Sequence, residues 1–149
     1  MRQIVCPNCR AANRIPPDRD ALHARCGRCG EKVFQGAPVE VDGAGLKAHL
    51  RADRDQPVLL DVWAPWCGPC RAMAPQFARA AQRLEPEVRF LKLNADAAPE
   101  ASAELRVSGI PALILFKDGQ EIDRKAGAMT ADQIIAWSLQ ALNRAATAR

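Results

Sequence analysis

The fold of this chain can be inferred from residues 59–70, which read Leu59-Leu60-Asp61-Val62-Trp63-Ala64-Pro65-Trp66-Cys67-Gly68-Pro69-Cys70. An apolar run of strand length leads into two cysteines separated by two residues, and helical spacing of apolar residues follows. We therefore expect a buried strand over 57–63 and a long helix over 67–84, with the cysteines at its start. The helix dipole and its unpaired N–H groups stabilise a thiolate, the form of cysteine that attacks disulfides.

The two cysteines have different expected roles. Cys67, at the helix start, is expected to be the exposed nucleophile, and Cys70, one turn later, the more buried resolving thiol. The Cys67 thiolate would attack a substrate disulfide, and Cys70 would then release the reduced substrate and leave a Cys67–Cys70 disulfide. A metal knuckle is the alternative, but no ligand pair remains for it once four N-terminal cysteines share one metal.

The run from Asp61 to Arg71 resembles the active-site signature of the thioredoxin family. Further matches follow in the family's order: Lys92-Leu93-Asn94, Gly109-Ile110-Pro111, Phe116-Lys117-Asp118-Gly119 and Gly127-Ala128. With its N-terminal cysteine motif, the chain is similar to the zinc-ribbon-bearing thioredoxins of the thioredoxin 2 type. The expected fold class is α/β: a thioredoxin fold, with a mixed central sheet flanked by helices, and a small N-terminal zinc ribbon.

Asp61 and Lys92 are expected to support the cysteines. Asp61 interrupts an apolar strand, where burial of its carboxyl should raise its pKa. The resemblance implies that Asp61 helps to deprotonate Cys70, and that Lys92 lies near Asp61 and moderates its desolvation. A solvent-facing acid at a strand edge and a solvated lysine at a strand end are the alternatives.

Pro111 matches the cis-proline loop that faces the cysteines in the family. There the backbone of Ile110 would pair with an extended substrate, whereas a trans proline opening a strand is the alternative. The Gly68-Pro69 pair resembles reducing thioredoxins rather than oxidants or isomerases. The expected flat docking surface for partners comprises Trp66, Gly68, Pro69, Ile110, Gly127 and Ala128.

A second cysteine motif lies near the N-terminus, where two CxxC pairs are separated by sixteen residues. Four thiolates from two such knuckles form the tetrahedral set that zinc prefers. Two surface disulfides or free thiols are the alternative. We expect Gly27 and Gly30 to take positive φ in the knuckles, and one structural zinc ion to supply folding energy. Its expected ligands are Cys6, Cys9, Cys26 and Cys29.

The composition changes at Gly36-Ala37-Pro38, which we interpret as a linker. It separates a zinc ribbon of residues 1–36 from a thioredoxin domain of residues 37–149. The ribbon holds seven basic and three acidic residues, so its net charge of +4 is that of the whole chain. An anionic partner such as nucleic acid is one interpretation. We favour compensation of the zinc tetrathiolate, because the basic residues form no contiguous run.

Hydrophobic spacing predicts the remaining elements of the main domain. Strands are expected over 39–41, 88–93, 110–116 and 121–125, and helices over 46–51 and 99–105. Pro75 should kink the long helix, and the tail after Leu142 should fray. Thr130 should cap a last helix whose inner faces comprise Ile134, Ile135, Trp137, Leu139 and Leu142.

The expected function is that of a protein-disulfide reductase. It would reduce disulfide-containing proteins and, as the resemblance implies, be re-reduced by a flavin-dependent thioredoxin reductase with NADPH. We expect it to be a monomer. A zinc-dependent redox-sensing or partner-binding module, with the thioredoxin domain as its output, is the alternative. No apolar run approaches the length of a bilayer span and no signal peptide is evident, so we expect no membrane association and a cytoplasmic location.

Overall fold

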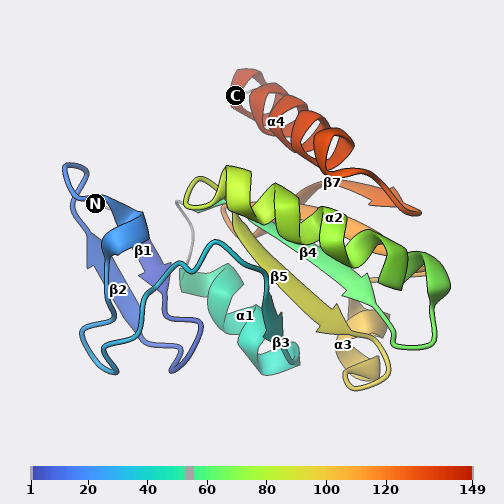
Figure 1. The fold of residues 1–149 in the computed structure, drawn as a ribbon, viewed down its shortest axis with the longest axis horizontal. Coiled ribbons are helices and arrows are strands. Elements are labelled where there is room, and N and C mark those ends of the chain that lie inside the picture. Colours follow the sequence, from blue (N-terminus) through green and yellow to red (C-terminus); the bar gives the residue numbers. More distant parts are fainter. Residues whose placement is uncertain (1, 53–55, 149) are drawn as a thin grey trace.

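A five-stranded mixed sheet forms the centre of the main domain in this computed structural model, which describes residues 2–52 and 56–148 (Figure 1). The sheet order is β3-β5-β4-β6-β7; β5 is parallel to β3 and β4, and β6 is antiparallel to β4 and β7. This arrangement confirms the expected mixed sheet. The elements are β3 (Val39–Val41), α1 (Gly43–Ala52), β4 (Val58–Trp63), α2 (Gly68–Leu84), β5 (Arg89–Asn94), α3 (Pro99–Glu104), β6 (Ala112–Lys117), β7 (Gln120–Ala126) and α4 (Ala131–Thr147).

The alternation of side chains along β4 divides the core into two layers. Leu59 packs in a cluster with Met73 and Phe77 of α2, whereas Leu60 packs with Leu46 of α1 on the opposite face. Figure 1 shows α2 and α4 on one side of the sheet and α1 and α3 on the other. Because strand side chains alternate with a period of two, Asp61 shares the α2 face with Leu59.

Helix α2 begins one residue later than expected, because Cys67 is its N-cap rather than its first helical residue. Pro69 lies in the first turn, where a missing N–H costs nothing. Pro75 lies inside the helix on its exposed side, and the kink expected there stays a prediction.

Helix α4 differs from the expectation in two ways. It continues to Thr147, so the prediction of a frayed tail after Leu142 was wrong. Alanine is the strongest helix former, and Arg144 in the last turns also donates to the Asp123 carboxylate at 3.3 Å. Leu139 is 49 % exposed and does not line the inner face, because Trp137 and Ala141 occupy the buried side of this part of the helix.

The N-terminal residues form a small unit of their own. Strands β1 (Arg2–Val5) and β2 (Ala12–Ile15) pair as an antiparallel hairpin, and a short 3-10 helix, η1 (Ala21–His23), follows. Its buried cluster comprises Ile4, Cys6, Ile15, Ala21, Cys26, Val33 and Phe34. This unit lies beside α1, and β1 is the strand of the hairpin that contacts this helix (Figure 1).

The two cysteine knuckles have the same backbone shape. Gly30 follows its knuckle with φ +81°, and Arg10 holds the equivalent position with φ 65°. Each donates its N–H to the carbonyl of the first cysteine of its knuckle, at 2.9 Å. The expectation for Gly27 was wrong, because the left-handed residue comes after the second cysteine and not between the two.

A buried arginine joins this N-terminal unit to the sheet. Arg89, at the start of β5, is fully buried and donates to the carbonyl oxygens of Val5 at 2.9 Å and Val33 at 2.8 Å. Its guanidinium lies 4.2 Å from the centre of the Phe34 ring. Buried Glu85 accepts a hydrogen bond from the Gly36 N–H at 3.1 Å. These contacts position the N-terminal unit against the main domain.

Candidate functional site

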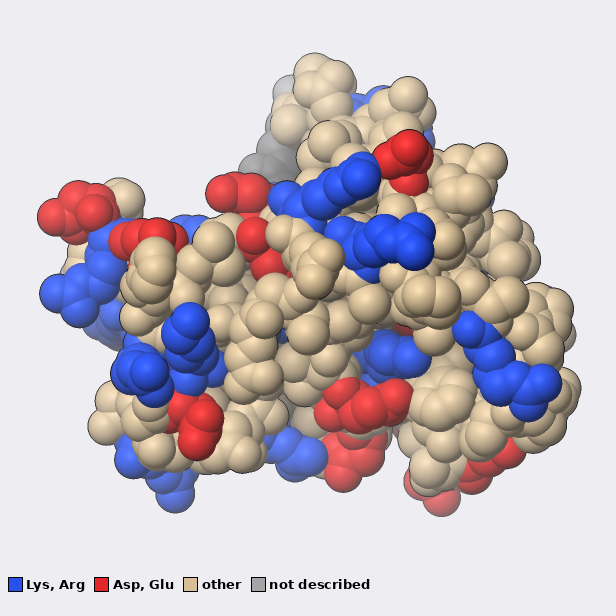
Figure 2. All heavy atoms as spheres, viewed as in Figure 1, with Lys and Arg blue, Asp and Glu red and all other residues tan. Residues whose placement is uncertain are grey.

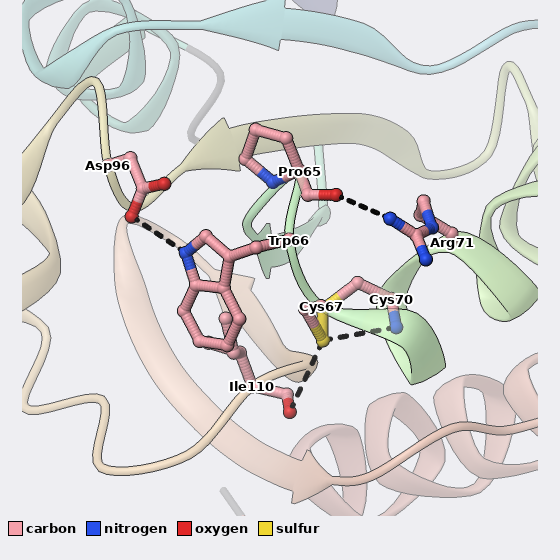
Figure 3. Close-up of a disulfide and its surroundings, with 7 residues drawn as sticks. All are labelled: Pro65, Trp66, Cys67, Cys70, Arg71, Asp96 and Ile110. Carbon is pink, nitrogen blue, oxygen red and sulfur yellow. Dashed lines mark hydrogen bonds between the residues drawn. A yellow bond between two sulfur atoms is a disulfide. The ribbon is translucent and has the colours of Figure 1, made fainter.

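Cys67 and Cys70 form a disulfide at the start of α2, with their Cα atoms 5.2 Å apart (Figure 3). The sulfur of Cys67 accepts the backbone N–H of Cys70 at 3.2 Å, so it caps the helix. A donor held at this place also stabilises negative charge on the same sulfur when the disulfide is opened. The pair expected from the CxxC spacing is therefore present in its oxidised form.

The exposure expected for Cys67 was wrong. Cys67 is 4 % exposed and Cys70 is 2 % exposed, so both residues are covered in the disulfide form. The sulfur of Cys67 lies against the loop before β6, 3.8 Å from the carbonyl oxygen of Ile110 (Figure 3). The bond to Cys70 and this loop together cover the sulfur, which the sequence spacing did not reveal.

The loop that faces the disulfide contains a cis bond between Ile110 and Pro111. This agrees with the cis-proline geometry that the resemblance implied, rather than with a trans proline. The carbonyl of Pro111 accepts the N–H of Gly127 at 2.9 Å, and Gly127 has φ +93°, a conformation that favours glycine. Residues 127 and 128, distant in sequence, are thereby brought beside the loop.

The residues expected to form a docking surface surround the disulfide. Trp66 is 67 % exposed, and its indole N–H donates to the Asp96 carboxylate at 3.2 Å (Figure 3). This bond fixes a large apolar ring at the surface, next to the disulfide. Gly68, Pro69, Gly127 and Ala128 are exposed, and Ile110 is half-buried.

Asp61 is buried on the face of the sheet that α2 covers. It is 1 % exposed, and within the described chain no hydrogen-bond partner reaches either carboxylate oxygen. Burial raises its pKa to about 7, while the charge of Lys92 acts in the opposite direction. The alternative of a solvent-facing carboxylate is therefore excluded.

The placement of Asp61 relative to α2 follows from the packing around Leu59. Met73 of α2 packs in the same cluster as Leu59 of β4. Because α2 runs antiparallel to β4, Cys70, which precedes Met73 by about one helical turn, lies toward the end of β4. Asp61 follows Leu59 by two strand residues, a comparable distance in the same direction. We infer that Asp61 lies beneath the first turn of α2, which carries Cys70.

Lys92 lies between Asp61 and the edge of the sheet. It is the register partner of Asp61 in the parallel β4–β5 ladder, and its ammonium lies 4.7 Å from the centre of the Trp63 ring. Lys92 is half-buried, so it is not the fully solvated lysine of the alternative interpretation. Its position agrees with the expected proximity to Asp61.

Four cysteines of the N-terminal unit come together as a candidate metal site. The sulfurs of Cys6, Cys9, Cys26 and Cys29 all lie within 4.8 Å of one another. Cys6 and Cys29 are 3.5 Å apart, and Cys9 and Cys26 are 3.6 Å apart, measured between sulfurs. Zn–S bonds of about 2.3 Å in a tetrahedron require sulfurs about 3.8 Å apart. The four residues therefore fit a zinc ion.

Hydrogen-bond donors around these sulfurs favour thiolates. The N–H groups of Asn8 and Cys9 point to the Cys6 sulfur at 3.4 and 3.5 Å, and that of Arg28 to the Cys26 sulfur at 3.4 Å. The Cys29 N–H and the Asn13 amide lower the pKa of Cys26 to about 6, whereas burial raises that of Cys6 to about 12. A bound dication would stabilise the thiolate forms of both Cys6 and Cys26.

Comparison with known proteins identifies both parts of the chain. A family model described as Thioredoxin matches residues 38–140, which is more than half of the chain. The chain belongs to the thioredoxin family. A second family model, described as Thioredoxin 2, N-terminal, matches residues 5–31, the segment that holds the four clustered cysteines. The chain is thus a thioredoxin-type disulfide oxidoreductase with an N-terminal segment of the zinc-ribbon family.

Individual thioredoxins are similar over different lengths. Thioredoxin C-3 of Corynebacterium nephridii is 38 % identical over 141 residues, which span 95 % of this chain and 96 % of that protein. Thioredoxin 1 of Nostoc sp. is 44 % identical, over 62 % of this chain and 86 % of its own. The solved structure of chloroplastic thioredoxin z, at 26 % identity, superposes with a TM-score of 0.64 over 72 % of this chain and 96 % of its own.

Three charged residues around the thioredoxin sheet were missed by sequence reasoning. Arg89 and Glu85 are buried where the N-terminal unit meets the sheet, and Glu40 is in register with Lys92. Arg89 interrupts an apolar run, as Asp61 does, so the cost of burying a charge could have identified it from the sequence.

None of the helices in the described part of the chain is long and apolar enough to cross a membrane.

Proposed function

We propose that this chain is a protein-disulfide reductase that uses Cys67 as nucleophile and Cys70 as resolving thiol. The observation that supports this most strongly is the Cys67–Cys70 disulfide, with the Cys70 N–H directed at the Cys67 sulfur and the Ile110–Pro111 loop beside it. The helix N-terminus favours the thiolate of Cys67, and the backbone of Ile110 beside it would pair with an extended substrate.

The proposed reaction consists of two thiol–disulfide exchanges. The Cys67 thiolate attacks one sulfur of a substrate disulfide, forms a mixed disulfide and expels the other substrate sulfur as a thiolate. Cys70 then attacks the Cys67 sulfur, so that the Cys67–Cys70 bond forms and the second substrate thiolate leaves. Two electrons pass to the substrate, and a flavin-dependent thioredoxin reductase would restore the dithiol with electrons from NADPH.

The supporting residues receive the following proposed roles. Asp61 accepts the proton of Cys70 as that thiol becomes a nucleophile, and a pKa of about 7 suits a base at neutral pH. Lys92 moderates the desolvation of Asp61. Pro111 holds the loop, and the partner docks on the surface formed by Trp66, Gly68, Pro69, Ile110, Gly127 and Ala128.

We propose that the N-terminal unit is a zinc ribbon covering residues 1–36, and that residues 37–149 form the thioredoxin domain. One zinc ion would be bound by the four clustered cysteines, where it supplies structural cross-linking and no redox chemistry. Thiolates of this kind persist in a reducing compartment, which supports a cytoplasmic location. On the face shown in Figure 2, basic side chains are interspersed with acidic ones, a distribution that disfavours nucleic-acid binding.

The reductase proposal is tested by insulin reduction coupled to thioredoxin reductase and NADPH. The matched variants Cys67→Ser and Cys70→Ser change one sulfur each and leave the rest of the site intact. Cys67→Ser should abolish turnover without forming adducts, whereas Cys70→Ser should accumulate a mixed disulfide with the substrate, visible by mass spectrometry. Turnover that survives in Cys67→Ser would refute the assignment of the nucleophile.

A second candidate function is a zinc-dependent redox-sensing or partner-binding module. The contacts of Arg89 with the carbonyls of Val5 and Val33 favour it, because they connect the cysteine unit directly to the thioredoxin sheet. Zinc release by peroxide should then change the reduction potential of the Cys67–Cys70 pair. An unchanged potential after complete zinc release would limit the ribbon to a structural role.

A further inference from the structure

Three charged residues form one row across the sheet, from its edge to the centre. The β3–β5 ladder pairs Glu40 with Lys92, and the β5–β4 ladder pairs Lys92 with Asp61. Neighbouring strands lie about 4.8 Å apart, and residues in register point to the same face of a sheet. The row therefore places one cation between two carboxylates on the face that α2 covers.

Burial increases along this row toward the redox site. Glu40 is at the surface on the edge strand, Lys92 is half-buried, and Asp61 is 1 % exposed. Within the described residues, Lys92 forms no ion pair at 4.0 Å or less with either carboxylate, and its ammonium lies over the Trp63 ring instead. Its charge is therefore shared between the two acids rather than held by one.

We propose that Glu40 is a positioning residue of the redox site: its carboxylate offsets the charge of Lys92 and keeps the Asp61 carboxyl a stronger base toward the Cys70 thiol. This rests on the proposed role of Asp61 in disulfide reduction. Glu40 touches neither substrate nor sulfur, and it acts only through the field at Asp61.

The direction of each interaction supports this inference. Burial is the largest cause of the raised pKa of Asp61, Lys92 lowers that pKa, and Glu40 raises it. Desolvation also raises the pKa of Glu40, against the attraction of Lys92. The two carboxylates thus compete for one ammonium, and negative charge on Glu40 favours the protonated form of Asp61.

The other groups around the row do not replace Glu40 in this role. From β6, the register partner of Asp61 is the apolar Leu113, and α2 contributes Cys70 as its titratable group near Asp61. On its outer side, Glu40 lines a cavity of about 330 Å³ together with Arg10, Asp42 and His49. Arg10 is held by the Asp42 carboxylate at 2.9 Å, so its charge is offset locally.

The size of the effect follows from the spacing of the strands. Glu40 and Asp61 are two strand spacings apart, about 10 Å. Coulomb interaction across that distance, with an effective dielectric constant between 80 and 20, shifts a titration midpoint by about 0.3 to 1.3 pH units. Neutralising Glu40 should therefore weaken proton binding at Asp61 by about twofold to twentyfold.

The test is the titration of the Asp61 carboxyl in the full oxidised chain, measured by carbon-13 NMR in Glu40→Gln and in the unchanged protein. Glu40→Gln should lower the Asp61 midpoint by about 0.3 to 1.3 pH units, and the shift should shrink in high salt. Lys92→Met should move the midpoint upward. Glu104→Gln is the matched control, because it removes an exposed glutamate paired with Lys47 on α1, and it should not move the midpoint.

The functional consequence is read separately from reductase-coupled turnover. The acidic limb of the pH–rate profile should move down in Glu40→Gln by the same amount as the Asp61 midpoint. A midpoint that stays within 0.2 pH units of its original value or rises would overturn the inference, whatever the turnover. A lowered midpoint in a chain without turnover would uphold the effect on Asp61 and refute the proposed function instead.

Discussion

Replacing Arg89 by methionine tests whether the zinc ribbon is part of the stable fold. Methionine keeps a long apolar side chain but removes the guanidinium that binds the carbonyls of Val5 and Val33 and stacks on Phe34. The variant therefore changes the polar contacts between the ribbon and β5 while leaving most of the buried volume filled.

The loss of stability can be worked out from these contacts. Two buried carbonyls lose a charged donor at about 1 to 2 kcal/mol each, and the stacking on Phe34 contributes about 1 to 2 kcal/mol more. Removing a buried charge that was costly to desolvate offsets part of this loss. Without the charge of Arg89, a buried Glu85 carboxylate would be costly. This cost is limited, because burial already raises the pKa of Glu85 to about 7, so that the carboxylate can take up a proton. We expect a net loss of about 3 kcal/mol in the free energy of unfolding.

The measurement is urea unfolding of the zinc-loaded chain at pH 7, followed by tryptophan fluorescence. Arg83→Met is the matched control, because Arg83 forms an exposed ion pair with Asp132 at 2.7 Å and should contribute less than about 1 kcal/mol. If Arg89→Met loses no more stability than Arg83→Met, the contacts of Arg89 with the ribbon do not stabilise the fold and the reasoning fails.

Three further predictions concern protons, metal and packing. The pKa of Glu85 is about 7 in the folded chain against an ordinary 4.5, so its contribution to stability is complete below about pH 4.5 and is lost as the pH rises through 7. Glu85→Gln should therefore reduce the fall in stability between pH 5 and 8 by about 2 to 3 kcal/mol, as measured by urea unfolding at each pH; an undiminished fall would contradict the assignment. A strong chelator should release one zinc per chain, counted by a colorimetric indicator, and should lower the melting temperature; a melting temperature that does not change would exclude a folding role for the metal. Asp123→Ala removes the acceptor of the Trp137 indole N–H, bonded at 2.8 Å, and should cost about 1 to 2 kcal/mol in the same unfolding assay, unlike the exposed Asp132→Ala.

Much of the redox site could be predicted from local sequence. The apolar strand, the two cysteines and the helical spacing that follows lie within one continuous segment, so their order in the chain is also their order in space. The same holds for the two CxxC knuckles, whose spacing matches a four-cysteine site. Asp61 was found because a charge inside an apolar strand is costly to bury and stands out in the sequence.

Errors of the sequence analysis occurred where a neighbour from elsewhere in the chain decides the outcome. Cys67 is covered by the loop at Ile110, more than forty residues later, and not left open by its place at the helix start. The last turns of α4 are ordered in part because Arg144 reaches Asp123 on β7. Helical spacing predicted that the last helix is amphipathic, but it did not show which of its residues the rest of the protein covers. Leu139 was therefore wrongly expected on the inner face.

The sequence by itself determined the chemistry of this protein: two sulfurs at a helix start, four more in two knuckles, and a carboxyl forced into an apolar strand. Only the tertiary structure decided how these parts are connected. Arg89 finds its partners at Val5 and Val33, and Glu40 meets Lys92 and Asp61 through strand register. Such contacts join residues far apart in the chain, and they depend on sheet order and docking, for which hydrophobic periodicity carries no signal.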